Sequence, residues 1–187
     1  MFKVVTIDNK KIPMKSNGYT GRLYARFFSK DFLKSIFELE KIDKDNITSD
    51  ELSTLDELAY VLAKTANPKI GTFEEWLSQF DSPFSVTMAS EQFIALLFDS
   101  TKGMVKPKKK DTSKSNEEIS TFYELVVSGL RLGLTLRDID KMDVGEVLDL
   151  VITMVNTLGD VDEFNNSVAN TTHIRDATQE DIRKFFG

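Results

Sequence analysis

The sequence contains no cysteine and only one histidine among its 187 residues. Without cysteine, the chain can form no disulfide, no thiolate nucleophile and no cysteine-ligated zinc site. The single histidine, His173, follows Thr172 in a polar stretch and has no second imidazole with which to share a metal ion. We therefore interpret His173 as an exposed residue rather than a catalytic base.

Long hydrophobic runs are also missing. No window approaches the 18 or so apolar residues of a membrane span, and the first eight residues do not begin a secretory signal. The composition, with 41% hydrophobic residues and a net charge of −6, fits one globular domain or two small ones. Collagenous, fibrous and wholly disordered chains are excluded, and the sequence predicts a soluble, cytoplasmic protein.

Enzyme signatures are absent as well: the chain has no Walker loop, no Rossmann glycine fingerprint and no nucleophile elbow. Two acidic clusters, 43–48 and 138–143, resemble calcium loops at first sight. In the first, Ile47 and Thr48 occupy positions where an EF-hand needs an oxygen ligand and a glycine, and the second fails in the same way. We expect no catalytic residue, no metal and no cofactor, although a dispersed pair of carboxylates leaves no sequence signature and stays open.

The charge is unevenly distributed. Residues 1–100 carry a net charge of −3, residues 101–116 a net charge of +5, and residues 117–187 a net charge of −8. The middle stretch has almost no large apolar side chain, so it cannot bury enough surface to fold by itself. We therefore predict the following division: an N-terminal hairpin and helical lobe at 1–100, a basic flexible linker at 101–116, a small acidic helical lobe at 117–159, and a polar tail at 160–187.

The lysines of the predicted linker admit other interpretations. Residues 106–114 hold a cluster of lysines that is able to contact a phosphate backbone. The cluster lacks the interleaved aromatic and arginine side chains that stack on or read bases, and the sequence pI is about 4.9. We expect neither a nucleic-acid nor a membrane partner, and attraction between the linker and an acidic lobe remains an alternative.

The predicted fold class is mainly α: a short N-terminal β-hairpin, a small helical bundle, the linker and a second, all-helical lobe. Phe2–Ile7 and Lys11–Met14 have the β-branched composition of strands, and Pro13 indicates an edge strand. After Asn17 the apolar residues recur with the period of a helix and form a stripe. Asp31 either interrupts this stripe or lies beside it. The predicted capping boxes of the first lobe are Thr48 with Glu51 and Thr72 with Glu75, separated by a loop at Pro68 and Gly71.

The second lobe is predicted to contain three helices. The first has a cap at Ser115 and ends at Gly133, a short one covers Leu136–Lys141 after Thr135, and the third begins at Asp143 with Glu146. A lobe of 43 residues rarely buries enough surface to be stable alone. We expect it to dock on the first lobe, on a copy of itself or on a partner. A last short helix at 178–186 would present Ile182, Phe185 and Phe186.

Aromatic side chains are concentrated in the first lobe. The chain has 14 phenylalanines, most of which must be buried. Some of them are expected to form either core or a groove for a partner helix, two arrangements that the sequence does not separate. The aromatic stripe consists of Phe27, Phe28, Phe32, Phe37, Phe73, Trp76 and Phe80.

This layout resembles the tail assembly chaperones of long-tailed, siphovirus-type bacteriophages, the family of the lambda G and GT proteins. The resemblance covers residues 1–157 and is diffuse. In the first half it is carried by the segments Phe2–Ile7, Lys11–Met14, Phe28–Lys34, Leu55–Tyr60 and Thr72–Leu77. In the second half it is carried by Phe122–Leu125, Gly133–Met142 and Gly145–Leu150.

The resemblance implies a non-enzymatic chaperone that keeps the phage tape measure protein soluble and recruits tail tube subunits, the major tail protein. It implies that the protein acts in the host cell cytoplasm and is missing from the mature virion. It also implies that a ribosomal frameshift appends the second lobe, for which Lys108–Lys110 at the junction would fit a run of adenines. We assign tape measure shielding to Phe27, Trp76 and Phe80, and tube subunit recruitment to Leu136, Ile139 and Met142.

Three alternatives remain open at this stage. The same helices fit a structural component of the virion tail or a cytosolic helical adaptor. A carboxylate enzyme would need a cleft with convergent acidic groups, and a nucleic-acid-binding protein would use the linker lysines. Self-association of the chain is a further expectation that the sequence leaves undecided.

Overall fold

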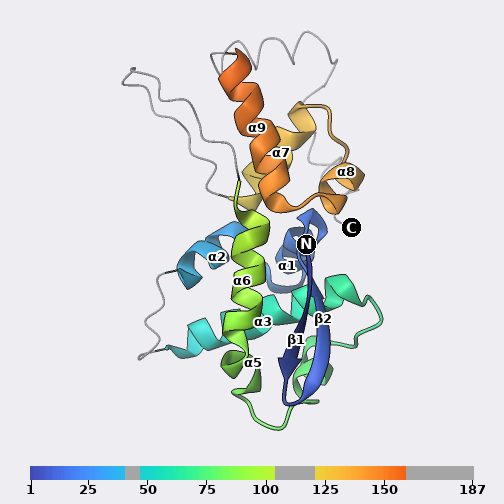
Figure 1. Cartoon of the computed structure of the whole chain (residues 1–187), viewed down its shortest axis with the longest axis vertical. Helices are drawn as coiled ribbons and strands as arrows, with labels where there is room; N and C mark the ends of the chain where they lie inside the picture. Colours follow the sequence, from blue (N-terminus) through green and yellow to red (C-terminus); the bar gives the residue numbers. More distant parts are fainter. Residues whose placement is uncertain (41–46, 104–120, 159–187) are drawn as a thin grey trace.

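The computed structural model of the chain describes residues 1–40, 47–103 and 121–158. Within these ranges, an N-terminal two-stranded antiparallel hairpin is followed by helices, which confirms the predicted mainly helical fold class (Figure 1). The strands are β1 (Phe2–Ile7) and β2 (Lys10–Lys15). The helices are α1 (Gly18–Phe28), α2 (Phe32–Leu39), α3 (Ser49–Ala66), α4 (Phe73–Leu77), α5 (Ser85–Met88), α6 (Ser90–Thr101), α7 (Phe122–Arg131), α8 (Leu136–Lys141) and α9 (Val144–Leu158).

Several sequence predictions lie outside the described residues. These are most of the acidic cluster at 43–48, the lysine cluster at 106–114, the cap at Ser115 with Glu118, and the tail from 159 that holds His173, Ile182, Phe185 and Phe186. None of the helices in the described ranges combines the length and the hydrophobicity that crossing a bilayer requires.

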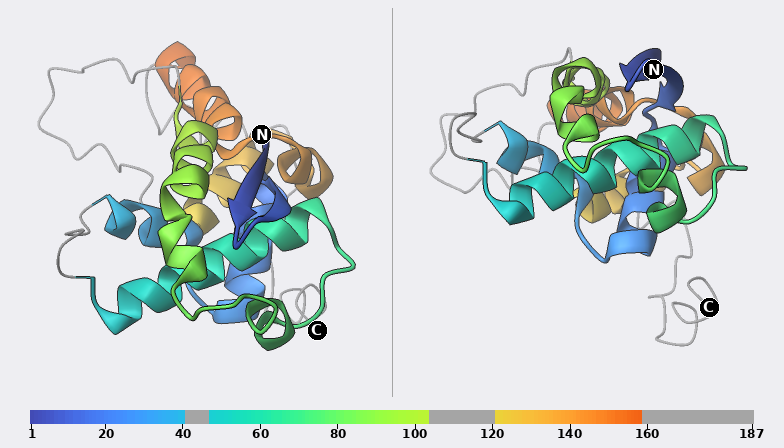
Figure 2. Two further views of the ribbon diagram at one scale, coloured as in Figure 1. Left: turned by 60° about the horizontal axis from the view of Figure 1, so that its bottom comes forward. Right: turned by 90° about the horizontal axis from the view of Figure 1, so that it is seen from below.

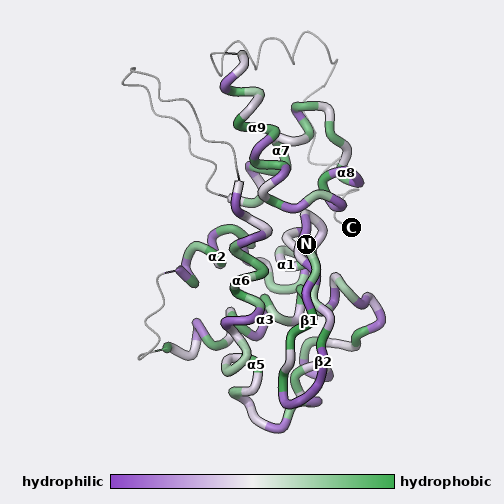
Figure 3. The backbone as a smooth tube through the Cα atoms, in the orientation of Figure 1, coloured by the Kyte–Doolittle hydropathy of each residue, from purple (hydrophilic) through white to green (hydrophobic). Residues whose placement is uncertain are grey.

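The hairpin is closed by a two-residue turn at Asp8 and Asn9. Both residues have positive φ, 46° and 60°, as type I′ turns require, and the flanking residues Ile7 and Lys10 pair. The turn end of the hairpin is hydrophilic (Figure 3). One face of the hairpin is buried by Val5, Ile7, Ile12 and Met14.

Side-chain caps define most helix starts, because an exposed oxygen at the N-cap satisfies an amide that the helix leaves unpaired. The boxes predicted at Thr48 and Thr72 are confirmed, and Thr135 forms one with Asp138. Asp31 caps α2 by accepting from the Lys34 amide, so it interrupts the stripe rather than decorating it. The described start of α7 has its own box, Thr121 with Glu124.

Helix α3 occupies the centre of the first lobe. In the view from below, α3 lies between the hairpin with α6 on one side and α1 with α4 on the other (Figure 2). Its residues Leu58–Ala63 are almost completely inaccessible to solvent. The core formed around α3 continues into the second lobe through Phe122, Ile139 and Val147.

The helices α7, α8 and α9 gather at one end of the molecule and pack on α1, α2 and α6 (Figure 1). Two glycines of α1 make this contact close. A Cβ atom on Gly18 would lie 2.1 Å from the Ile139 carbonyl oxygen, and one on Gly21 would lie 2.5 Å from the Phe122 ring. The second lobe therefore docks on the first, one of the three arrangements expected for it, while the predicted division at 101–116 stays a prediction.

Polar groups fix the same contact between the lobes. The Gly18 amide donates to the Met142 carbonyl over 2.9 Å, and the Phe122 amide donates to both carboxylate oxygens of Asp31. Arg22 pairs with Asp140 over 3.2 Å. Asp31 thus caps α2 and holds the first residue of α7 with one carboxylate.

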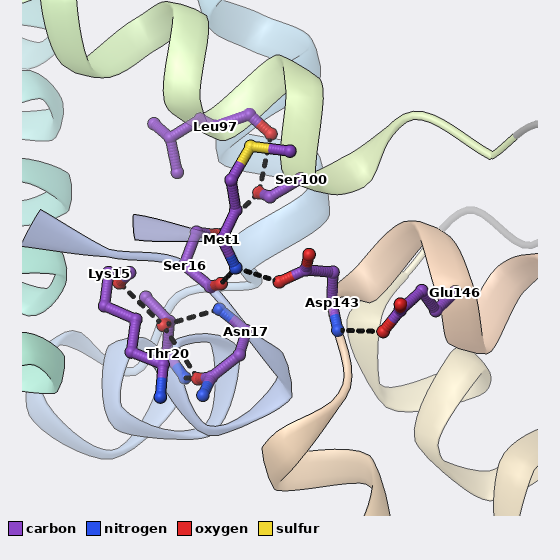
Figure 4. Close-up of polar contacts among 9 residues, drawn as sticks. All are labelled: Met1, Lys15, Ser16, Asn17, Thr20, Leu97, Ser100, Asp143 and Glu146. Atoms are coloured by element: carbon purple, nitrogen blue, oxygen red, sulfur yellow. Dashed lines mark hydrogen bonds and ion pairs between the residues drawn. The ribbon is translucent and has the colours of Figure 1, made fainter. Parts of the chain in front are cut away.

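Figure 4 shows the polar contacts where β1 meets the start of α9. The Met1 ammonium donates to the Ser16 carbonyl and to the Asp143 carboxylate, and the Asp143 amide donates to Glu146 over 2.9 Å. The hydroxyl groups of Ser16 and Ser100 lie 2.6 Å apart and are buried. The hairpin, α6 and α9 therefore meet at a shared network of hydrogen bonds.

Replacement of Gly21 with alanine tests the close packing of α1 against α7. A glycine-to-alanine change inside a helix normally stabilises a protein. Here the added methyl group overlaps the Phe122 ring, so we expect Gly21→Ala to lower the free energy of unfolding by about 1–3 kcal/mol in urea titrations. In a Phe122→Leu background the loss should shrink, and a net stabilisation by Gly21→Ala alone would contradict the packing.

Candidate functional site

The three residues predicted to shield a partner are linked through one aromatic cluster. Trp76 of α4 lies with its ring centroid 5.0 Å from that of Phe80 and 5.8 Å from that of Tyr60. Phe27 of α1 contacts the same Tyr60 at 5.7 Å. Tyr60 of α3 thus contacts Phe27 and Trp76, and Phe80, beyond the end of α4, joins the cluster through Trp76.

These three residues differ in accessibility. Trp76 is buried and Phe80 packs partly buried against the core, whereas 46% of the Phe27 surface is exposed. Trp76 and Phe80 thus contribute mainly to the core, the arrangement that the number of phenylalanines favours. Phe27 is the predicted shielding residue that a partner reaches without rearrangement of the protein.

A cleft of about 330 Å³ opens beside Trp76. Strand β2, the loop before α4 and α4 itself all contribute lining residues. The lining residues are Ile12, Pro13, Asn67, Ile70, Gly71, Glu75, Trp76 and Gln79. The predicted loop at Pro68 and Gly71 therefore forms one side of this cleft.

The residues predicted to recruit a second partner lie on α8 and, for Met142, directly after it, at the contact between the lobes. Ile139 is 1% exposed and sits against the two glycines of α1 and α7, Gly18 and Gly129. Leu136 and Met142 are partly buried and pack on the same core. In this structure the three side chains stabilise the docking of the second lobe, and Ile139 is inaccessible to another protein.

A buried polar cluster under α1 and α2 was not predicted from the sequence. Glu57 of α3 is 7% exposed and accepts hydrogen bonds from Tyr24 at 3.1 Å and from Lys30 at 2.8 and 2.9 Å. The Tyr24 hydroxyl gives its one proton to Glu57, so the Ser35 hydroxyl, 3.0 Å away, donates to the Tyr24 oxygen. Burial raises the pKa of Tyr24 far above its usual range, with Glu57 adding to the effect, so the hydroxyl stays protonated and bridges α1, α2 and α3.

The position of Glu57 within its helix is the signal that sequence reasoning missed. Glu57 lies within the mostly apolar stretch that runs from Leu55 to Leu62. Its neighbours on the helix are buried. A carboxylate at such a position needs a partner, because a buried, unpaired charge is costly. Lys30, distant in sequence, supplies the opposite charge.

The neighbouring carboxylate of Asp56 is less well satisfied. Its Oδ1 atom is buried and has no hydrogen-bond partner among the described residues. Burial raises the pKa of Asp56 to about 6, and the charge of Glu57 adds to this rise. Asp56 and Glu57 are adjacent on α3, but neither lines the cleft beside Trp76.

Metal coordination needs at least three suitable side chains close together. Among residues 1–40, 47–103 and 121–158, no group of three histidine, cysteine, aspartate or glutamate side chains is placed to hold an ion. The expectations of no metal, no cofactor and no catalytic residue remain predictions.

Besides Phe27 of α1 and Phe37 of α2, large apolar side chains are exposed on the hairpin with α5 and on the second lobe. Strand β1 and helix α5 contact each other. Phe2 and Val4 of β1, Phe84 directly before α5 and Met88 at its end are between 49% and 83% exposed. We call these four residues the hairpin patch. On the second lobe, the exposed apolar residues of α7 and α9 are Tyr123, Leu130, Leu150 and Met154.

Comparison of the chain with protein-family models, curated proteins and solved structures finds no match.

The Asp56 carboxylate generates a prediction about stability and pH. Its pKa is about 6 in the folded protein against an ordinary value of 3.8, so the native state binds the proton more tightly and loses stability as the pH rises from about 4 to 6. We expect Asp56→Asn to raise the free energy of unfolding by about 1–2 kcal/mol at pH 7, after allowing for screening by solvent.

The pH dependence separates this effect from a general change in α3. Because Asp56 is protonated in the folded protein near pH 4, most of the gain from Asp56→Asn should disappear there in thermal or urea unfolding. Asp99→Asn, at an exposed position of α6, serves as the control and should change stability by less than about 0.5 kcal/mol. An equal gain from Asp56→Asn at pH 4 and pH 7 would refute the assignment.

Proposed function

We propose that this protein is a non-enzymatic phage tail assembly chaperone that binds the tape measure protein, keeps it soluble and recruits major tail protein subunits in the host cytoplasm. The proposal rests on the resemblance of residues 1–157 to that family. The structural observation that supports it is the exposure of the four large apolar side chains of the hairpin patch, because exposed apolar surface is typical of protein interaction sites.

The physical logic concerns the partner. A long helical tape measure protein exposes apolar stripes until the tail tube encloses it, and an acidic chaperone with its own apolar surface would cover them. The hairpin patch offers Phe84 and Met88, 55% and 83% exposed, and Phe27 adds a further accessible ring. We assign tape measure binding to this lobe.

Recruitment of tube subunits is assigned to the second lobe. The α8 residues first chosen for this role are held in the contact between the lobes, and Ile139 would have to leave the core to bind a partner. The accessible apolar side chains Leu150 and Met154 of α9, 42% and 38% exposed, offer contacts that need no rearrangement.

Co-expression with the tape measure protein of the same phage tests the proposal. We expect the full chain to keep that partner in the soluble fraction and to co-purify with it. The double variant Phe84→Asp/Met88→Asp should lose most of this effect, since both side chains are exposed and their replacement leaves the core intact.

The matched control is Leu150→Asp/Met154→Asp on the second lobe. This variant should still bind the tape measure protein and should lose binding of the major tail protein. If the full chain neither binds nor solubilises the tape measure protein, or if mass spectrometry finds the chain in purified virions, the chaperone proposal is wrong.

A further inference from the structure

The outer edge of strand β2 has backbone groups available for another strand. The Thr6 amide donates to the Gln92 side chain at 3.2 Å, and the Gln92 side-chain amide donates to the Thr6 carbonyl at 3.4 Å, so Thr6 faces away from β2. In an antiparallel pair, the partner of such a residue also turns its backbone groups outward. The partner of Thr6 is Lys11. Two residues further along β2, Pro13 pairs with Val4 and turns its backbone outward in the same way.

Both ends of this edge are occupied. The Lys15 carbonyl accepts a hydrogen bond from Thr20 at 3.2 Å, and the Lys10 ammonium reaches across to the Gln79 carbonyl. Between them, the register turns the amide and carbonyl of Lys11 and the carbonyl of Pro13 outward. The available edge is therefore short, about the length of three residues.

The cleft beside Trp76 lies along this edge. Ile12 and Pro13 of β2 line it together with Ile70 and Gly71 of the loop. Its volume of about 330 Å³ is at the low end of the range for small-ligand pockets. Addition of an extended segment to a strand edge, with pockets for alternate side chains, is a recurring mode of peptide recognition.

The charge around the cleft is positive although the chain as a whole is acidic. The Lys64 ammonium donates to the carbonyls of Ile70 and Gly71, and the Lys10 ammonium donates to that of Gln79, which places both on lining residues. Lys11 and Lys69 are exposed directly beside the lining residues. Of the acidic groups, Glu75 lines the cleft and accepts from the Thr72 amide at 2.8 Å.

We propose that this cleft binds an acidic, extended segment of another polypeptide, which adds to the outer edge of β2 between Lys11 and Pro13. The Lys11 amide donates to a carbonyl of the segment, and the surrounding lysines attract its carboxylates. Alternate side chains of the segment contact Ile12, Ile70 and Trp76. This inference does not depend on the proposed chaperone function.

The competing explanation is that lysine and proline only protect an exposed strand edge from pairing, a common role for both residues. That explanation accounts for the sequence of β2. It predicts no saturable binding of a peptide. It also assigns no role to the residues of the loop and of α4 that line the cleft. The two explanations thus differ in a measurable result.

Trp76 is the only tryptophan of the chain, so its fluorescence reports on the cleft without a label. The probe is the blocked peptide acetyl-Asp-Val-Asp-Val-Asp-Val-amide, titrated into the full chain at low salt. We expect a saturable change in Trp76 emission together with a chemical-shift change of the Lys11 amide. The matched peptide with lysine in place of aspartate should cause neither.

Two variants separate backbone pairing from charge. Lys11→Ala keeps the outward amide and removes one charge, whereas Lys11→Pro also removes the amide without breaking a hydrogen bond to β1. We expect Lys11→Pro to weaken binding more than Lys11→Ala does, and Lys11→Glu/Lys69→Glu to weaken it about tenfold. Lys34→Glu, exposed on α2, is the control and should leave the affinity unchanged.

The outcomes that overturn the proposal are equally defined. Absence of saturable binding by the acidic peptide leaves edge protection as the explanation. Equal weakening by Lys34→Glu shows attraction to net charge alone, and an equal response to free succinate identifies a pocket for small anions. Failure of the chaperone proposal changes none of these results, because the titration contains no tape measure protein.

Discussion

The structure depends on two glycines of helix α1 at its contact with the second lobe. At Gly18 and Gly21 the backbone of α1 is bare, and the Ile139 carbonyl and the Phe122 ring occupy the space that a Cβ atom would fill. This close approach lets the second lobe share the core of the first. A lobe of its size gains from this arrangement the buried area that it cannot provide alone.

Aromatic contacts carry the same core from end to end. Rings meet in sequence from Phe80 through Trp76 to Tyr60, and from there to Phe28 and Tyr24. Phe32 then links Tyr24 to Phe122 of the second lobe, with centroid distances of 5.9 Å on both sides. Edge-to-face packing of this kind adds stability beyond the burial of area. The cleft and the contact between the lobes are thus opposite ends of one packed cluster.

The local elements could be predicted from the sequence because their signals are local. Capping at Thr48, Thr72 and Thr135 depends on residues three positions apart, and the hairpin depends on a turn of two residues. The interfaces could not be predicted, because they depend on which faces meet. Ile139 occupies an apolar position on a short helix whether it contacts a partner or α1. The same limit applies to Glu57, whose partner Lys30 is 27 residues away.

Synthesis on the ribosome gives the bare face of α1 a different significance. Asp31 and the Phe122 amide that it holds are 91 residues apart. At the usual speed of translation, about 5–20 residues per second, Phe122 is synthesised roughly 5–20 s after Asp31. During that interval the glycine face and the edge of Phe32 are open to water, nascent-chain chaperones and proteases. The rate at which ribosomes translate the intervening codons determines how long this surface of α1 stays uncovered.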